Sequence, residues 1–202
     1  MDITPQMVKE LRERSGAGMM DCKRALEETG GDVERAQEVL RTKGLAAAAK
    51  RADRVAAEGV IDAYIHMQGR LGVLIEVNCE TDFVANTDDF RGLARDLAMQ
   101  VAATNPRWIS REDVPADVVE GERKVFEEQA REDGKPDAVV PKIVEGKLEA
   151  FYKEQVLLDQ PWVRDDDVTI GELVAQTGAK VGEKVQVSRF ARFRLGETTA
   201  EG

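Results

Sequence analysis

Acidic side chains recur at short intervals near the middle of the chain, at Glu76, Glu80 and Asp82. Residues two or four apart on an extended strand point to the same face, so two of these carboxylates could lie side by side. A hydrolase uses such a pair as general acid and general base. Alternating acids on an edge strand are commonly just solvated, however, and the surrounding sequence indicates no substrate cleft. The pattern therefore does not favour an enzyme.

The other reactive residue types do not form a catalytic motif. His66 is the only histidine, and no cysteine, serine or carboxylate motif surrounds it. The chain contains no GxxxxGK phosphate-binding loop, because Gly178 and Gly182 stand one residue too close and Glu183 precedes Lys184. It also contains no GxSxG nucleophile motif. We therefore expect no catalytic residue.

The two cysteines, Cys22 and Cys79, do not indicate a metal site. Neither has another soft metal ligand near it in the sequence, so a zinc site has no support. We expect both to be small buried hydrophobic residues, and we expect no metal and no cofactor. A disulfide between them stays open as an alternative, although a reducing cytoplasm disfavours it.

The balance of charges argues against a general nucleic-acid-binding protein. The 202 residues include 39 acidic and 29 basic side chains, which gives a formal net charge of -10 at pH 7. Binding to nucleic acid needs clustered Lys and Arg side chains that displace counterions from the phosphates. We expect a protein partner or a small ligand instead.

Nothing in the sequence predicts a membrane protein. No apolar run reaches the roughly 18 residues that a membrane-spanning helix needs. The first five residues, MDITP, lack the character of a signal peptide. We expect a cytoplasmic protein whose chain is long enough to form one or two domains.

The first 54 residues predict a helical module. Apolar residues recur at helical spacing in three segments, which glycine turns at 16–18 and 30–31 separate. Segment 45–58 is rich in Ala, Lys and Arg and has a narrow apolar stripe, which favours a connecting helix between two bodies. We place the domain boundary near Arg54, so that residues 1–54 form a three-helix module with its connecting helix.

The rest of the chain predicts an α+β core. Three segments show the two-residue alternation of strands, at 59–67, 73–79 and 184–195. Gln68-Gly69-Arg70 supplies the turn of a hairpin between the first two. The alternation of the third slips in parity, which indicates a β-bulge. We expect a small antiparallel three-stranded sheet.

Helices are expected to pack on this sheet. Helical patterns cover four segments, 90–102, 115–133, 136–158 and 169–182. The second is heavily charged and must be peripheral, and a loop at 159–163 leaves the third. We therefore expect an α+β core domain over residues 55–196 and a flexible tail over 197–202.

The segment Thr81-Asp82-Phe83-Val84 interrupts the alternation after strand 73–79. Thr87 can cap the helix that follows, with aspartates in its first turn. Phe83 therefore lies in a strand-to-helix turn beside the carboxylate of Asp82. Its large apolar ring can either fold back into the core or be offered to a partner, and spacing alone leaves both open.

Two long motifs resemble one known family. Residues 76–86, EVNCETDFVAN, match without a gap the signature of elongation factor Ts, the guanine-nucleotide exchange factor of the translation GTPase elongation factor Tu. Residues 11–26, LRERSGAGMMDCKRAL, resemble the amino-terminal motif of that family. The motifs follow the family's order. The chain is therefore identified as similar to the short bacterial form of this family.

The resemblance implies an N-terminal module of the ubiquitin-associated type, a fold that holds one helix or strand of a partner. In the family, the corner that corresponds to Arg12, Met19 and Met20 contacts a helix of the GTPase domain. Adjacent residues on a helix point about 100° apart, so at least one of the two methionines should be partly exposed. Methionine adapts readily to an apolar groove on a partner.

The resemblance also implies a role for the turn at Thr81, Asp82, Phe83 and Val84. Phe83 is expected to wedge into an apolar gap of the GTPase beside its magnesium and phosphate site. Asp82 is expected to disturb the partner's magnesium-coordinating network. The chain itself is expected to bind no nucleotide.

Two further expectations concern assembly and the rival function. Short members of the family can reach their partner as a homodimer, and the final strand, with Phe190, Phe193 and Leu195, is the natural dimer surface.

The alternative function is an acidic adaptor whose three-helix module binds some other protein while the core acts as a scaffold. That alternative predicts no acceleration of nucleotide release.

Overall fold

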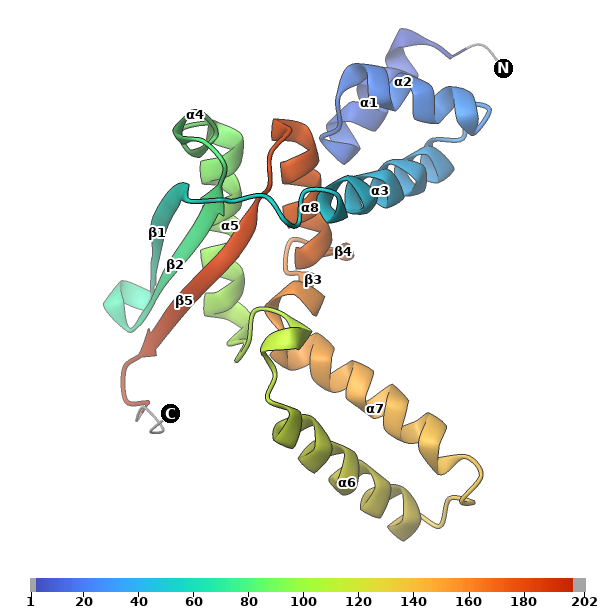
Figure 1. Ribbon diagram of the computed structural model, residues 1–202, viewed down its shortest axis with the longest axis vertical. Coiled ribbons are helices and arrows are strands. Elements are labelled where there is room, and N and C mark those ends of the chain that lie inside the picture. Colours follow the sequence, from blue (N-terminus) through green and yellow to red (C-terminus); the bar gives the residue numbers. More distant parts are fainter. Residues whose placement is uncertain (1–2, 198–202) are drawn as a thin grey trace. The chain divides into compact units, whose positions relative to one another are not determined.

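A computed structural model describes residues 3–197 and divides the chain into two compact units. The first unit combines residues 1–99 with 172–202, and the second consists of residues 100–171. The described residues form α-helices, a three-stranded sheet and a two-stranded sheet (Figure 1). Among the helices described here, none is both long and apolar enough to cross a membrane. Of the predicted tail over 197–202, all but Glu197 lies outside the described residues.

The N-terminal segment folds into three helices, as predicted: α1 (Pro5–Ser15), α2 (Met19–Glu28) and α3 (Val33–Ala49). The side chain of Thr4 accepts a hydrogen bond from the amide of Met7 at the start of α1. Gly16 ends α1 in the left-handed region, with φ of 66°. Asp32 caps α3 by accepting a hydrogen bond from the amide of Arg35.

All three helices contribute to one small apolar core. Its buried residues are Val8, Leu11, Cys22, Ala25, Leu26 and Ala36. Cys22 is fully enclosed in this core, as expected for a small hydrophobic residue. The predicted three-helix module is confirmed.

The connecting helix predicted over 45–58 does not exist as a separate element. Gly44 does not break α3, which continues through the alanine run and ends at Ala49. Beyond it, the side-chain ammonium of Lys184 donates to the carbonyls of Ala52 and Arg54, at 2.7 and 3.0 Å. These carbonyls are therefore bound by a residue distant in sequence, and the segment forms turns instead of further helix.

The three-stranded sheet has the order β1-β2-β5 and is antiparallel throughout (Figure 1). Its strands are β1 (Glu58–His66), β2 (Leu71–Cys79) and β5 (Gln186–Arg194), and the short helix η1 (Met67–Gly69) joins the first two. On β5, Arg189 pairs with Glu76 and Val187 pairs with Val77. Ser188 is left without a partner position, so the predicted bulge is confirmed.

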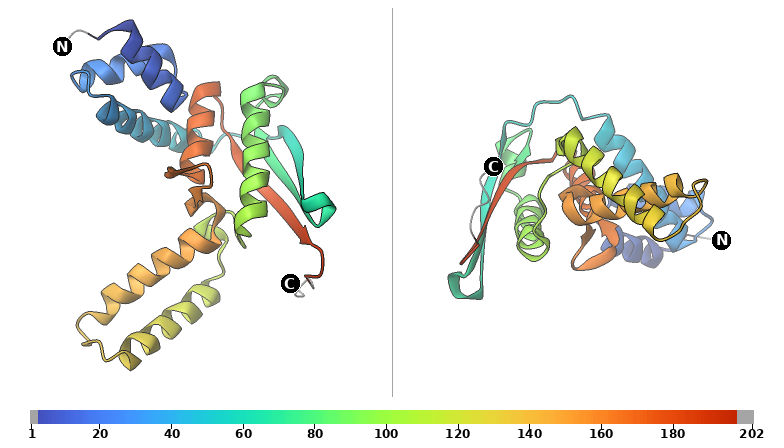
Figure 2. Two further views of the ribbon diagram at one scale, coloured as in Figure 1. Left: turned by 180° about the vertical axis from the view of Figure 1, so that it is seen from behind. Right: turned by 90° about the horizontal axis from the view of Figure 1, so that it is seen from below.

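One face of the sheet is buried. The β2 side chains on this face are Leu71, Val73, Ile75, Val77 and Cys79. Helix α5 (Asp88–Thr104) lies along this face in both views (Figures 1 and 2). Its own buried stripe includes Phe90, Leu93 and Leu97. Thr87 accepts a hydrogen bond from the amide of Phe90, which confirms it as the predicted cap.

The opposite face of the sheet, here called the outer sheet face, exposes apolar side chains to solvent. They are Ile61 and Ile65 of β1, Leu74 of β2 and Phe193 of β5. The apolar alternation of β1 therefore marks this outward face. Phe190 pairs opposite Ile75 and is half-buried on the other face, whereas Leu195 follows the strand and is exposed.

The second unit contains an antiparallel helix pair, α6 (Ala116–Glu132) and α7 (Val140–Gln155), visible in Figure 1. The buried cluster of this helix pair consists of Ala130, Val140, Val144 and Leu148. The short helices η2 (Arg111–Asp113) and η3 (Leu157–Asp159) flank the pair. The segment after η3, predicted as a loop, contains a small hairpin of strands β3 (Pro161–Trp162) and β4 (Asp165–Thr169).

Two buried glutamines fix the start of this hairpin. The amide nitrogen of Gln100 donates to the side-chain oxygen of Gln160, at 3.1 Å, and the oxygen of Gln100 accepts from the amide of Val163, at 2.9 Å. Gln160 in turn donates to the carbonyl of Glu154, and Thr104 donates to Gln160. Because each buried amide finds partners, the network holds the chain without the cost of unpaired polar groups.

Helix α8 (Ile170–Val181) follows β4 and leads into β5, close to the predicted bounds of 169–182. Gly182 ends it with φ of 79°. Residues 183–185 then join α8 to β5. This short connection brings Glu183 and Lys184 to the end of β2.

Candidate functional site

The turn after β2 is a one-turn helix, α4 (Asp82–Ala85). Thr81 is its N-cap, and its hydroxyl oxygen accepts a hydrogen bond from the amide of Val84, at 3.4 Å. The side chain of Asn86 donates to the carbonyl of Asp82, at 2.9 Å, which closes the other end. The sequence thus gives this short helix a cap on each side.

The ring of Phe83 projects from this helix into solvent. Phe83 is 82% exposed, whereas its neighbours Val84 and Ala85 are buried. Asp82 is also exposed. Of the two alternatives left by the sequence, the structure excludes the one in which the ring fills the core of its own chain.

The carboxylate of Glu183 holds the start of this turn. It accepts hydrogen bonds from the amides of Glu80 and Thr81, at 3.0 and 3.1 Å. It also accepts one from the hydroxyl of Thr81, at 2.6 Å. Three donors of the turn therefore converge on one side chain from the other end of the sequence.

The carboxylate of Glu80 makes the reciprocal contact. It accepts a hydrogen bond from the amide of Lys184, at 2.6 Å, and pairs with the guanidinium of Arg54, at 3.2 Å. The Lys184 amide, with Arg54 as the weaker contributor, holds the pKa of the Glu80 carboxyl below its ordinary value. Glu80 is therefore an ionised structural group.

The carboxylates of this region do not form the acid–base pair of a hydrolase. Glu76 pairs with Arg189 at 2.6 Å, and this hydrogen bond is the main reason that its pKa is lowered. Glu76 and Glu80 are each occupied by a cation or an amide, so they do not form an acid–base pair. His66 is stacked on Tyr64 and shares a 3.0 Å hydrogen bond with its hydroxyl.

The cysteines are both buried and both free. The thiol of Cys79 donates to the carbonyl of Thr81, at 3.1 Å. Burial raises the pKa of this thiol, and the nearby carboxylate of Glu183 adds to the effect. Between residues 3 and 197, no group of three or more His, Cys, Asp or Glu side chains is arranged to hold a metal ion.

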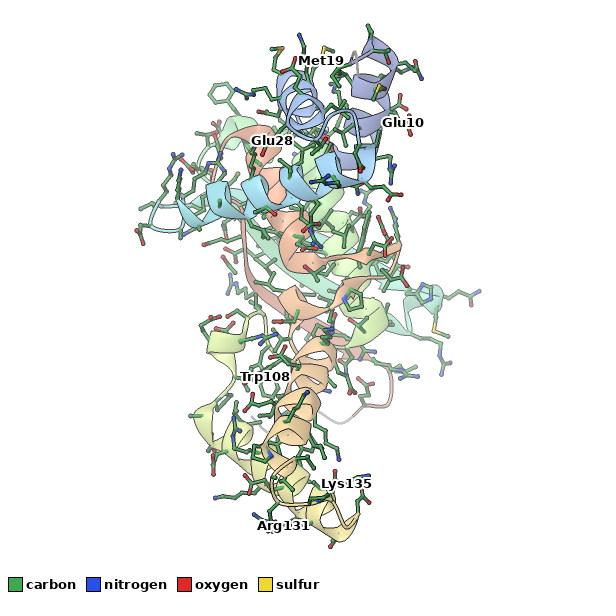
Figure 3. All side chains as sticks on the ribbon, turned by 90° about the vertical axis from the view of Figure 1, so that its right-hand side faces the viewer. Glu10, Met19, Glu28, Trp108, Arg131 and Lys135 are labelled. Carbon is green, nitrogen blue, oxygen red and sulfur yellow. The ribbon has the colours of Figure 1, made fainter. Side chains whose placement is uncertain are left out.

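A second surface lies on the N-terminal module. Met19 is 59% exposed and Met20 is 63% exposed, so both predicted contact residues reach solvent. Figure 3 shows the side chain of Met19 at the surface of the module. Together with Arg12 they line a groove of about 350 Å³, whose other lining residues are Ile3, Pro5, Val8, Lys9 and Lys23. The groove is apolar at its base and carries three cations.

Sequence reasoning missed the two residues that fix the turn, Glu183 and Lys184. In the sequence, Glu183 and Lys184 only rule out a phosphate-binding loop and mark the start of the last predicted strand. No local pattern links them to Thr81, because about 100 residues separate the partners.

The comparisons with known proteins agree with the motifs. The family model "Elongation factor TS" matches residues 7–197. The elongation factor Ts of Carboxydothermus hydrogenoformans is 60% identical over 199 residues, covering 98% of this chain and 92% of the relative. That of Fervidobacterium nodosum is 57% identical over 197 residues, covering 98% of this chain and 100% of the relative.

The chain belongs to the elongation factor Ts family. Guanine-nucleotide exchange on elongation factor Tu is therefore its function, and elongation factor Tu is its partner. The family's signature at residues 76–86 forms the end of β2 and all of α4. It thus includes the exposed ring of Phe83 and the carboxylate of Glu80.

Titration of the Glu80 carboxyl should be visible at the backbone amide of Lys184, because the two share a hydrogen bond. The pKa of Glu80 is lowered from its ordinary value of 4.5. Its contribution to stability is therefore complete above 4.5, the value taken for the unfolded chain, and is lost as the pH falls through the folded value. In NMR spectra, the Lys184 amide signal should stay in place from neutral pH to about 4.5 and move only below it.

Glu80→Gln should remove this movement at low pH. Glu128→Gln is the matched control, since Glu128 is exposed on α6 and should leave the titration unchanged. A Lys184 signal that titrates above pH 4.5 in the unmodified protein would contradict the hydrogen bond.

Proposed function

We propose that the chain releases GDP from elongation factor Tu by inserting the ring of Phe83 into an apolar gap beside the partner's magnesium and phosphate site. The observation that carries this proposal is the 82% exposure of Phe83 on a helix whose flanks are buried or hydrogen-bonded. Burying a side chain of this size contributes about 1.5–3 kcal/mol. In the free protein the ring stays in water, so this free energy of burial can be gained only when the complex forms.

The ring accelerates release only if the partner binds it better without nucleotide than with it. A binding partner shifts an equilibrium through differential affinity alone. The coupling is reciprocal. Bound nucleotide must lower the partner's affinity for this chain by the same factor by which this chain lowers the partner's affinity for nucleotide. GTP binding then dissociates the complex.

Asp82 acts beside the ring. Its exposed carboxylate lies at the first position of α4, next to Phe83 in sequence. Carboxylate oxygens are the ligands that magnesium prefers, so an added carboxylate disturbs the partner's magnesium-coordinating network. Without the magnesium charge the phosphates are held less tightly, and the nucleotide leaves faster. Thr81 caps the helix that carries Asp82, and buried Val84 anchors it.

The N-terminal module binds the partner separately, through Arg12, Met19 and Met20. Its groove combines flexible methionine side chains with Lys9, Arg12 and Lys23. This combination suits a partner helix that has an apolar face and acidic neighbours. The module therefore contributes affinity for the partner in either state. The turn at Phe83 makes the affinity higher for the empty partner than for the nucleotide-bound partner.

The protein acts by binding and catalyses no covalent step of its own. Supporting this view, Glu76, Glu80 and His66 are all engaged in structural contacts. We place its action in the cytoplasm, because its partner is a translation factor.

We further propose that two copies pair through the outer sheet face. Its exposed residues Ile61, Ile65, Leu74 and Phe193 come from all three strands. Two such faces can stack about 10 Å apart, as in a β-sandwich. Leu195 adds exposed apolar surface next to Phe193, whereas Phe190 lies on the other face.

Phe83→Ala should slow GDP release by about 30-fold, which corresponds to the loss of roughly 2 kcal/mol typical of an aromatic hot spot. Because the ring is exposed, folding stability should change by less than about 0.5 kcal/mol. The measurement is stopped-flow release of fluorescent GDP from elongation factor Tu. Val55→Ala removes another exposed apolar side chain, outside both contact surfaces, and should leave the rate unchanged.

Two outcomes would contradict the wedge. An unchanged rate for folded Phe83→Ala would exclude the ring from the mechanism. If even the unmodified protein binds a helix-bearing partner but never accelerates release, the acidic adaptor is the better description.

Phe193→Glu should separate the two copies, because it places a charge within the proposed apolar contact. Sedimentation velocity over a dilution series should show a dimer that dissociates on dilution for the unmodified protein, and a monomer at every concentration for the variant. Val125→Glu, which adds a charge on the exposed part of α6, is the control and should stay dimeric. An unmodified protein that is monomeric throughout would remove the dimer.

A further inference from the structure

The helix that carries Phe83 is too short to be stable by itself. Isolated helices below about 12–15 residues are marginal in water, and α4 has a single turn. Local caps alone do not fix its direction, because the caps at Thr81 and Asn86 belong to the same short segment. The contacts that fix the orientation of the Phe83 ring must therefore come from residues elsewhere in the chain.

The carboxylate of Glu183 provides that connection. It accepts hydrogen bonds from the amides of Glu80 and Thr81, at 3.0 and 3.1 Å, and from the hydroxyl of Thr81, at 2.6 Å. Hydrogen bonds to an ionised acceptor are the strong ones in proteins. One side chain therefore fixes both the exit of β2 and the N-cap of α4.

The connection is reciprocal. While Glu183 accepts from the backbone of Glu80, the side chain of Glu80 accepts from the backbone of Lys184, at 2.6 Å. Lys184 is also tied to the carbonyls of Ala52 and Arg54. Glu183 and Lys184 thus hold the turn against the segment that precedes β5 and against the linker from the N-terminal module. We call this set of bonds the carboxylate clasp.

We propose that Glu183 is a positioning residue for nucleotide exchange, which acts by holding α4 so that Phe83 points at the partner in one orientation. The proposal rests on the wedge function of Phe83. A ring that samples several orientations is competent in only a fraction of the molecules, and the apparent affinity falls by that fraction. Small misplacements of a positioned group also lower rates steeply.

A merely structural role for Glu183 makes a different prediction. If the carboxylate only stabilised the fold, its loss would affect exchange equally whether or not the ring is present. If it acts through the ring, its loss matters only while the ring is there. A double-mutant cycle separates the two.

The experiment measures the rate of fluorescent GDP release from elongation factor Tu over a range of exchange-factor concentrations up to saturation. It compares the full-length protein with Glu183→Ala, Phe83→Ala and the double variant. Glu183→Ala should slow release about tenfold while the thermal unfolding of the chain stays cooperative. In the Phe83→Ala background the same change should slow release less than twofold. Glu183→Gln, which keeps one acceptor oxygen, should be intermediate, and Glu128→Gln should have no effect.

Each outcome is decisive. If Glu183→Ala slows release by the same factor in both backgrounds, or not at all, the positioning role is wrong while the wedge stands. If Phe83→Ala itself has no effect, the wedge and the positioning role both fail. Should Glu183→Ala not fold, Glu183→Gln replaces it in the cycle, because it keeps one acceptor oxygen for the turn and leaves the cap at Thr81 in place.

Discussion

The structure depends on one charged contact, the carboxylate of Glu183 against the amides of Glu80 and Thr81. A one-turn helix at the end of a strand has no rigidity of its own. This contact gives it rigidity by joining it to the segment before β5. We propose that this anchorage fixes the direction of the capped helix, on which Phe83 is exposed and Val84 is buried.

Among the described residues, apolar side chains reach solvent at three surfaces to which the proposals above assign a role. They are the ring of Phe83, the methionine groove of the N-terminal module and the outer sheet face. Contiguous exposed apolar patches commonly mark interaction sites in proteins. The net charge of -10 helps to keep such a chain soluble before its partners cover these surfaces. We propose a different kind of occupant for each of these surfaces.

Local patterns predicted most of the fold, but not the contacts that fix the site. Alternation found the three strands and the bulge at Ser188, and helical spacing found the three-helix module. The helix predicted over 45–58 was wrong beyond Ala49, where the chain forms turns and Lys184 binds the carbonyls of Ala52 and Arg54. The role of Glu183 could not be predicted for the same reason, since both depend on residues about 100 or more positions away. Spacing showed that Phe83 lies in a turn, but only the burial of Val84 decided which side chain of that turn faces out.

The most direct test of the account is a fluorine NMR spectrum of the chain with 4-fluorophenylalanine at position 83 alone. The signal should report a solvent-exposed ring in the free protein and should shift when nucleotide-free elongation factor Tu is added. Adding GDP with magnesium should return the signal to its free position. A signal that stays unchanged in a complex shown by an independent method to have formed would contradict the central claim, because the ring would then have no contact with the partner.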